Sequence, residues 1–187
     1  MVAHQTSEYV IDLTNVKKRY SGGIEALRGI SMQVSQGQVF GLLGPNGAGK
    51  STLVKIMMSV IRPSHVEGTI LGRTVGNRSV LAKVGYLPEN HRFPRYLTGW
   101  QVLDYFGALA KVPRRVRHER AKMLLDMVKL SNAARRRVGT YSKGMQQRLG
   151  LAQAMINDPE LIMLDEPTDG LDPEGRVMVR NVLDHLR

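Results

Sequence analysis

The stretch that decides the fold of this 187-residue chain reads Gly44-Pro45-Asn46-Gly47-Ala48-Gly49-Lys50-Ser51-Thr52. It satisfies the pattern G-x-x-x-x-G-K-[ST] at every fixed position. Glycines are needed because the backbone must curl until several N–H groups point inward at phosphate oxygens, and a Cβ atom would obstruct the curl and the close approach. In this pattern Lys50 reaches the β- and γ-phosphates of a nucleotide, and the Ser51 hydroxyl ligates Mg²⁺. The stretch therefore predicts a nucleotide-binding loop.

The residues on either side predict the context that such a loop needs. Val39–Leu43 is apolar on both faces, which is typical of a buried strand covered on two sides. A helical pattern, Leu53–Ile61, follows the loop. A helix that starts near Lys50 would add the positive end of its dipole to the phosphate site. Strand, glycine loop and helix in this order form a phosphate-binding arrangement.

A second chemical cluster follows a short apolar run near the end of the chain. Leu161–Leu164 leads directly into Asp165 and Glu166. An apolar run that ends in two carboxylates is typical of a buried parallel strand whose carboxyl end faces the ligand crevice. Asp165 would hold Mg²⁺, and Glu166 would orient or deprotonate the attacking water. Many strands end in solvated acids, but beside an intact phosphate loop this run predicts a nucleotide hydrolase.

Further strands and helices are expected around these two motifs. Thr98 with Gln101 predicts a capping box at the start of one helix, and another helix is expected after Pro113. The apolar stripes of both helices indicate core packing rather than a cofactor site. The stripes comprise Val102, Leu103, Phe106, Leu109 and Ala110, then Ala121, Leu124, Leu125 and Val128. The remaining predictions are strands at Tyr9–Val16 and Gly29–Val34, a tight turn at Gln36-Gly37, and a short strand pair, Gly68–Leu71 and Val84–Leu87.

Composition excludes several classes of protein. The chain contains no cysteine, which excludes disulfides, thiolate metal sites and a cysteine nucleophile. The N-terminus lacks the pattern of a secretory signal, and charges or glycines interrupt every later apolar run, so we expect no membrane span. The net charge of +11 could attract nucleic acid, anionic lipid or nucleotide phosphate. The clusters Arg114, Arg115, Arg117 and Arg135, Arg136, Arg137 are interpreted as solvated surface, with lipid headgroups or an acidic partner as alternatives.

A third motif lies between the phosphate loop and the two carboxylates. The segment Tyr141-Ser142-Lys143-Gly144-Met145-Gln146-Gln147-Arg148 resembles the LSGGQxQR signature of the ATP-binding domains of ABC transporters. The residues that match are Ser142, Gly144, Gln147 and Arg148, whereas Lys143 replaces a glycine and Met145 a glutamine. Ser142 also predicts the N-cap of a helix whose free amides and dipole suit a phosphate. The resemblance extends from about Tyr9 to the last residue.

Three more positions resemble functional positions of this family. Tyr20 is similar to the aromatic residue that stacks on adenine. The segment Gly170-Leu171-Asp172 is similar to the family's loop that crosses a dimer interface, and Asp172 is its last residue. Glu89 stands where the family often has a glutamine that couples Mg²⁺ to the membrane subunit, and a glutamate there resembles bacterial export-type members.

The resemblance implies an α/β fold of the P-loop NTPase type with a mostly parallel sheet. It adds an N-terminal antiparallel β subdomain and an inserted helical subdomain at about 93–156, all within a single ABC ATP-binding domain, 1–187. The implied cofactors are ATP and Mg²⁺. The implied catalytic residues are Glu166 and Lys50, and the implied Mg²⁺ ligands are Ser51, Asp165 and Glu89. The implied nucleotide-binding residues are Tyr20, Gly44, Pro45, Asn46, Gly47, Ala48, Gly49, Lys50, Ser51, Thr52, Glu89, Ser142, Gly144, Asp165 and Asp172.

The resemblance also implies partners and a location. A transmembrane permease subunit and a second ATP-binding subunit are expected, because the signature of one copy contacts the nucleotide bound to another in this family. ATP hydrolysis would then drive transport of an unidentified substrate, with export favoured over uptake. We expect a peripheral protein on the cytoplasmic face of the plasma membrane, and we do not expect nucleic acid as a partner.

Two alternatives stay open at this stage. The first is a soluble ABC ATPase that acts on nucleic acid or ribosomes, for which a net charge of +11 would be useful. The second is a nucleotide-binding fragment with impaired hydrolysis. In the family, another strand and a histidine that contacts the γ-phosphate follow a helix like Arg176–Leu186, and His185 comes too early to serve. We therefore expect a C-terminally truncated domain.

Overall fold

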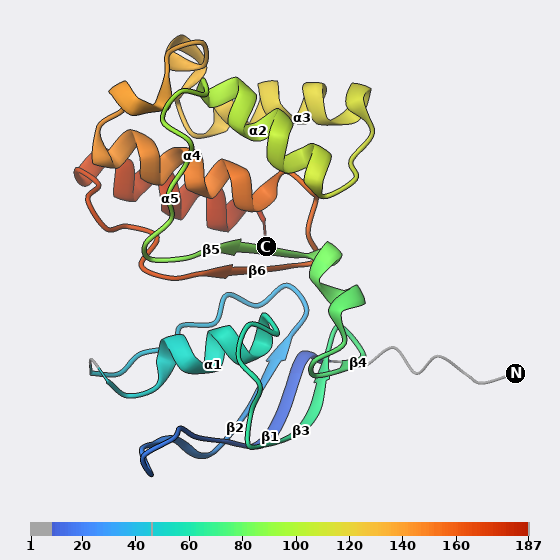
Figure 1. The fold of residues 1–187 in the computed structure, drawn as a ribbon. Helices are drawn as coiled ribbons and strands as arrows, with labels where there is room; N and C mark the ends of the chain where they lie inside the picture. Colours follow the sequence, from blue (N-terminus) through green and yellow to red (C-terminus); the bar gives the residue numbers. More distant parts are fainter. Residues whose placement is uncertain (1–8, 46, 187) are drawn as a thin grey trace, which may run out of the picture. The chain divides into compact units, whose positions relative to one another are not determined.

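The computed structural model describes residues 9–45 and 47–186, which belong to two compact units. The N-terminal unit extends to Leu81, and the C-terminal unit comprises Ala82–Leu186. Figure 1 shows the helices and strands of both. Among the described residues, no helix is both long and apolar enough to cross a lipid bilayer.

The N-terminal unit is built on an antiparallel sheet, as predicted. Its four strands have the order β2-β1-β3-β4. Leu13 and Val16 of β1 are fully buried, and so are Leu53 and Ile56 of α1, which packs beside the sheet (Figure 1). The elements are β1 (Tyr9–Arg19), β2 (Glu25–Ser35), α1 (Lys50–Met57), β3 (His65–Ile70) and β4 (Arg73–Thr74).

The buried strand predicted at Val39–Leu43 is absent from the N-terminal unit. Residues 39–43 form no strand, and 93% of the surface of Leu43 is exposed. A strand requires a neighbour for its backbone N–H and C=O groups, and the four-stranded sheet does not include this run. The preceding turn is confirmed: Gly37 has φ +70°, and the Gln38 N–H donates to the Ser35 carbonyl at 3.3 Å.

Helix α1 also differs in length from its prediction. It begins at Lys50, as expected for a helix that starts at the phosphate loop, but it ends at Met57 rather than Ile61. Ser59 adopts φ +55°, and a left-handed residue at this place ends a helix. The N–H groups of Val60 and Ile61 both donate to the Lys55 carbonyl, which closes the last turn.

The C-terminal unit combines a two-stranded parallel sheet with four helices. Strands β5 (Val84–Leu87) and β6 (Leu161–Leu164) pair in parallel. The strands predicted at Gly68–Leu71 and Val84–Leu87 are present as β3 and β5, but they do not pair with each other, because β3 pairs with β1 and β5 with β6. In Figure 1, α4 and α5 lie next to β5 and β6, and α2 and α3 lie on the other side of α4. The helices are α2 (Gly99–Leu109), α3 (Arg114–Met127), α4 (Lys143–Met155) and α5 (Pro173–His185), with short 3₁₀ turns η2 (Ser131–Ala133) and η3 (Val138–Thr140). A further 3₁₀ turn, η1 (Arg78–Lys83), starts in the N-terminal unit and ends in the C-terminal one.

The helices of this unit enclose one apolar core. The predicted capping box is confirmed: the Gln101 N–H donates to Thr98 Oγ1 at 3.2 Å, and the Thr98 N–H donates to Gln101 Oε1 at 2.9 Å. Of the predicted stripe on α2, Leu109 is 61% exposed, because the helix ends there. The fully buried members of the core include Leu103, Leu125 and Leu149. Helices α2, α3 and α4 fall within 93–156, and a helical subdomain with these bounds stays a prediction.

Candidate active site

The predicted phosphate loop needs two of its glycines for their backbone conformation. Gly47 and Gly49 have φ +84° and +88°, in the region that side chains disfavour. A Cβ atom on Gly49 would lie 2.5 Å from the Ala26 carbonyl oxygen and 2.7 Å from Leu27 Cδ2. Position 49 therefore requires glycine for two reasons, namely its backbone conformation and the close approach of strand β2. Asn46, the third residue of the predicted loop, lies outside the described residues.

Lys50 folds back over the loop that precedes it. Its Nζ donates to the Gly44 carbonyl at 2.5 Å and to the Pro45 carbonyl at 3.0 Å. The Ala48 N–H also donates to Pro45, at 3.2 Å. The ammonium thus lies at the mouth of the curled backbone, bound to weak neutral acceptors that a phosphate oxygen would outcompete.

Helix α1 begins without a side-chain cap. Its N-cap residue is Gly49, which has no side chain to accept from the first N–H groups, whereas Thr98, Ser142 and Asp172 cap α2, α4 and α5. The first turn of α1 also carries no acidic residue. The predicted ligands Ser51 and Thr52 lie in this turn. The N–H groups of this turn, the helix dipole and Lys50 suit a phosphate, and the two hydroxyls offer oxygen ligands of the kind that Mg²⁺ takes.

Tyr20 lies in the same unit, directly after β1. Its side chain is 38% exposed, and the Lys18 ammonium lies 4.9 Å from the centroid of its ring, in a cation–π contact. The Tyr20 N–H donates to the Ile24 carbonyl at 2.9 Å, which fixes the turn that carries it. Stacking of adenine on Tyr20 stays a prediction.

The predicted carboxylates gather at one edge of the parallel strands in the C-terminal unit. Leu87 and Leu164 are partners in the ladder, and the Asp165 N–H donates to the Leu87 carbonyl at 2.9 Å. Glu89 follows β5, and Asp165 and Glu166 follow β6, so all three lie beyond the carboxyl ends of the two strands. Asp165 is half-buried, whereas Glu89 and Glu166 are exposed.

Asp165 makes its neighbourhood negative. Burial, and then the charge of Asp165, raise the pKa of Tyr86, which lies on β5. Within the described residues, no three His, Cys, Asp or Glu side chains lie close enough together to bind a metal ion.

Glu166 has an unusual backbone conformation. Its φ of +50° lies in the left-handed region, which is strained for a residue with a side chain. Its carbonyl accepts two hydrogen bonds, from Gln147 Nε2 at 2.9 Å and from the Asp169 N–H at 3.1 Å. From the sequence, Gln147 is identified only as a match to the signature. Its place among the inward-facing apolar residues of a helix could have indicated a buried amide that needs a hydrogen-bond partner.

Two residues predicted to bind nucleotide already serve their own helices. Ser142 Oγ accepts from the Met145 N–H at 3.2 Å, which confirms it as the N-cap of α4. Asp172 Oδ1 accepts from the Gly175 N–H at 2.8 Å and caps α5. A Cβ atom on Gly144 would lie 3.2 Å from the Gly170 carbonyl oxygen, so this glycine permits close packing. Contacts of these residues with a nucleotide stay predictions.

The departure from the signature at Lys143 has a structural counterpart. Lys143 Nζ lies 2.8 Å from Asp169 Oδ2, and its side chain covers Gly170, which has φ +68°. The hydrogen bond and charge of Lys143 lower the pKa of Asp169. The lysine thus ties the start of α4 to the turn that follows Glu166.

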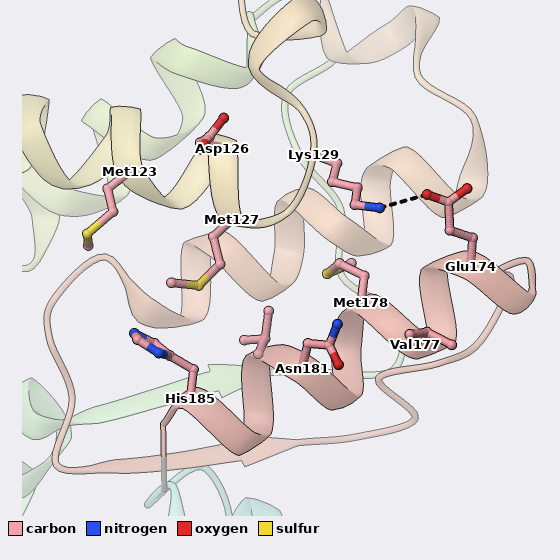
Figure 2. Close-up of a pocket in the computed structure, with 10 residues that line it drawn as sticks. Met123, Asp126, Met127, Lys129, Glu174, Val177, Met178, Asn181 and His185 are labelled. Carbon is pink, nitrogen blue, oxygen red and sulfur yellow. Dashed lines mark hydrogen bonds and ion pairs between the residues drawn. The ribbon is translucent and has the colours of Figure 1, made fainter.

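His185 lies far along α5 and lines a different part of the C-terminal unit. It borders a cavity of about 420 Å³ between α3 and α5, with Met123, Met127 and Met178 (Figure 2). The polar groups there include an ion pair of 2.7 Å between Lys129 and Glu174. His185 is exposed, and its exclusion from the nucleotide site stays a prediction.

Comparisons with known proteins agree on one family. Residues 27–169 match the model of the family described as ABC transporter. An uncharacterised ABC transporter ATP-binding protein of Synechocystis is 46% identical over 186 residues, covering 95% of this chain and 52% of that protein. The Nod factor export ATP-binding protein I of a Rhizobium species is 41% identical over 175 residues, covering 92% of this chain and 57% of that protein.

A solved structure gives the same result for the fold. The ATP-binding cassette MJ0796, in a dimeric post-hydrolysis state bound to ADP and Pi, superposes with a TM-score of 0.84. It is 26% identical, and the match covers 94% of this chain and 82% of that one. This confirms the predicted fold class. The chain spans about half the length of the curated relatives it matches.

Proposed function

The chain belongs to the ABC transporter family of ATP-binding proteins, and on that premise we propose that it binds MgATP and hydrolyses it to drive export through a separate membrane subunit. The observation that carries this proposal is the glycine loop that opens directly into the uncapped start of α1. Such a start satisfies its free N–H groups with a ligand, and phosphate is the ligand whose charge suits the helix dipole and Lys50.

Each unit contributes residues with distinct roles. Lys50 would exchange the Gly44 and Pro45 carbonyls for phosphate oxygens. Ser51, Asp165 and Glu89 would hold Mg²⁺, which neutralises charge on the β- and γ-phosphates when bound. Glu166, exposed beyond β6, would orient the attacking water and accept its proton.

The proposed partners follow from the relatives. The solved cassette is described as dimeric, and we propose that two copies of this chain enclose ATP, with Ser142 and Gly144 of one copy facing the nucleotide of the other. A permease subunit would complete the transporter at the cytoplasmic face of the membrane. Export is favoured because a relative is described as a Nod factor export protein; the substrate of this chain is not identified by that likeness.

Binding and turnover measurements on matched variants test the proposal. We expect Lys50→Ala to weaken MgATP affinity by at least about tenfold in calorimetry, because it removes the cation that pairs with phosphate. Glu166→Gln should keep that affinity and lower phosphate release by about 100-fold. Lys55→Ala, an exposed change on the same helix as Lys50, is the control and should change neither quantity.

Three results would contradict this function. The first is an absence of MgATP association, and the second is a Lys50→Ala chain that binds as tightly as the wild type. The third is stimulation of the ATPase by DNA or RNA together with a salt-sensitive complex, which would favour the soluble nucleic-acid ATPase instead.

A further inference from the structure

We propose that Gln147 is a positioning residue for the carboxylate of Glu166, an inference that rests on the proposed ATPase function. Gln147 is the one buried residue of polar or charged type within 9–45 and 47–186, with 4% of its surface exposed. Burial of an amide is unfavourable unless the amide is hydrogen-bonded. Gln147 Nε2 donates to the backbone carbonyl of Glu166 at 2.9 Å. Helix α4, which begins in the signature, thus holds the main chain of Glu166, the residue proposed to activate water.

The backbone of Glu166 needs such support. Its φ of +50° is disfavoured for a residue with a side chain, and a strained conformation persists only where its surroundings enforce it. The turn's own hydrogen bond, from the Asp169 N–H at 3.1 Å, leaves the second lone pair of the carbonyl free. Gln147 fills that lone pair from another element. Rotation of Glu166 out of the left-handed region would break both bonds and redirect its Cα–Cβ bond.

Helix α4 holds Gln147 in a fixed place relative to the strand ends. Gly144 and Gly150 lie three residues before and after it. A Cβ atom on Gly150 would lie 2.6 Å from Leu87 Cδ1, and one on Gly144 would lie 3.2 Å from the Gly170 carbonyl oxygen. The helix therefore packs closely against β5 and against the turn after Glu166. A long side chain between these two contacts has little freedom to leave its acceptor.

The chemistry of the amide suits this task. A lysine or arginine at this position would donate equally well, but its charge would pair with the carboxylates of Asp165 or Glu166 and lower their basicity. Glutamine donates a neutral hydrogen bond, so it fixes the main chain of Glu166 and leaves the charge of the side chain available for the water.

The first test is Gln147→Met, which keeps the length and the burial of the side chain and removes its donor. We expect the turnover number of this chain to fall by about tenfold or more while KM and Kd for MgATP change by less than about twofold, because only the geometry of the base is altered. Gln153→Met makes the same change at a half-buried position of α4 and should leave both quantities unchanged. A Gln147→Met chain with wild-type turnover overturns the inference.

A second variant gives a signature that a purely structural role would not produce. In Gln147→Glu, an ionised carboxylate repels the Glu166 carbonyl, whereas the protonated acid donates a hydrogen bond to it. The ratio of Gln147→Glu turnover to wild-type turnover should therefore rise as the pH falls. A ratio that stays constant across the pH range overturns the proposed role.

A third measurement does not depend on hydrolysis. Gln147→Met should accelerate hydrogen exchange of the Asp169 amide, which donates to the same carbonyl, and leave the amides of β6 and α4 protected. Unchanged exchange of Asp169, or faster exchange across the whole unit, overturns the positioning role. If the wild-type chain binds MgATP but releases no phosphate, the proposed function fails, and this exchange measurement still decides whether Gln147 holds the turn.

Discussion

At the scale of single residues, Gly49 shows how strongly one position is constrained. Two independent effects exclude a side chain there: the φ of +88°, and the carbonyl of Ala26 with the side chain of Leu27 in the space of a Cβ atom. Gly47 has a similar φ of +84° but nothing within 4 Å of its Cβ position. A side chain at Gly47 would therefore carry only the conformational cost, whereas one at Gly49 would carry the conformational and the steric cost.

We expect Gly47→Ala to lower the free energy of unfolding by about 1 kcal/mol, because alanine is disfavoured at positive φ. Gly49→Ala should cost about 3 kcal/mol, since overlap with β2 is added to the same conformational effect. Urea unfolding of both variants measures the two values. Equal losses would show that β2 gives way to the new methyl group, and the steric constraint would be wrong.

At the scale of elements, an ion pair joins α2 to α3. Arg117 Nε donates to Asp104 Oδ1, and His118 Nε2 lies 3.1 Å from the same oxygen. The hydrogen bond with Arg117 lowers the pKa of Asp104. Arg117 is only 18% exposed at its side chain, so the interpretation of its arginine cluster as solvated surface was wrong for this member.

Asp104→Asn should destabilise the chain by about 1 kcal/mol at neutral pH, the upper end of what a partly exposed ion pair contributes. Because the folded pKa of Asp104 is lowered, its contribution is complete above the unfolded value of about 3.9 and is lost as the pH falls through the folded value. Melting temperatures of wild type and variant should therefore converge in acid. Curves that stay equally far apart at every pH would contradict the pairing.

Elements whose determinants are local could be predicted from the sequence. The cap of α2 involves Thr98 and Gln101, and that of α4 is formed by Ser142, so three or four consecutive residues decide each helix start. The apolar run before Asp165 predicted β6 for the same reason. The strand predicted at Val39–Leu43 was wrong, because strand formation depends on a partner strand that the local apolar pattern does not reveal.

The candidate site follows the same division. Loop, carboxylates and signature were visible as motifs, and the structure places the predicted carboxylates at one strand edge. The bond from Gln147 to Glu166 was not predictable, because its partner is a backbone carbonyl 19 residues away rather than a side chain. The ion pair of Lys143 with Asp169 was equally hidden, since many exposed carboxylates were possible partners.

At the scale of the whole molecule, the proposed function requires two copies. The proposed dimer brings the signature of one copy to the nucleotide of the other, and a relative of known structure is described as dimeric in a post-hydrolysis state. A chain that binds ATP and cannot hydrolyse it should therefore accumulate as the dimer.

We expect Glu166→Gln with MgATP to double its mass in light scattering, and to return to the monomer when ATP is removed. Lys50→Ala should form less dimer at the same MgATP concentration, because it binds the ligand that joins the copies more weakly. Glu166→Gln without nucleotide is the control for unrelated association. A Glu166→Gln chain that binds MgATP and remains a monomer at all concentrations would contradict the dimer.

The run Val39–Leu43 has a consequence for how the purified chain behaves in solution. Val39, Phe40 and Leu43 each expose close to half of their surface or more, and adjacent exposed hydrophobic residues promote sticking between molecules. The formal charge of +11 opposes this through long-range repulsion. Added salt screens that repulsion but leaves the hydrophobic attraction in place. The purified chain should therefore associate least at low ionic strength.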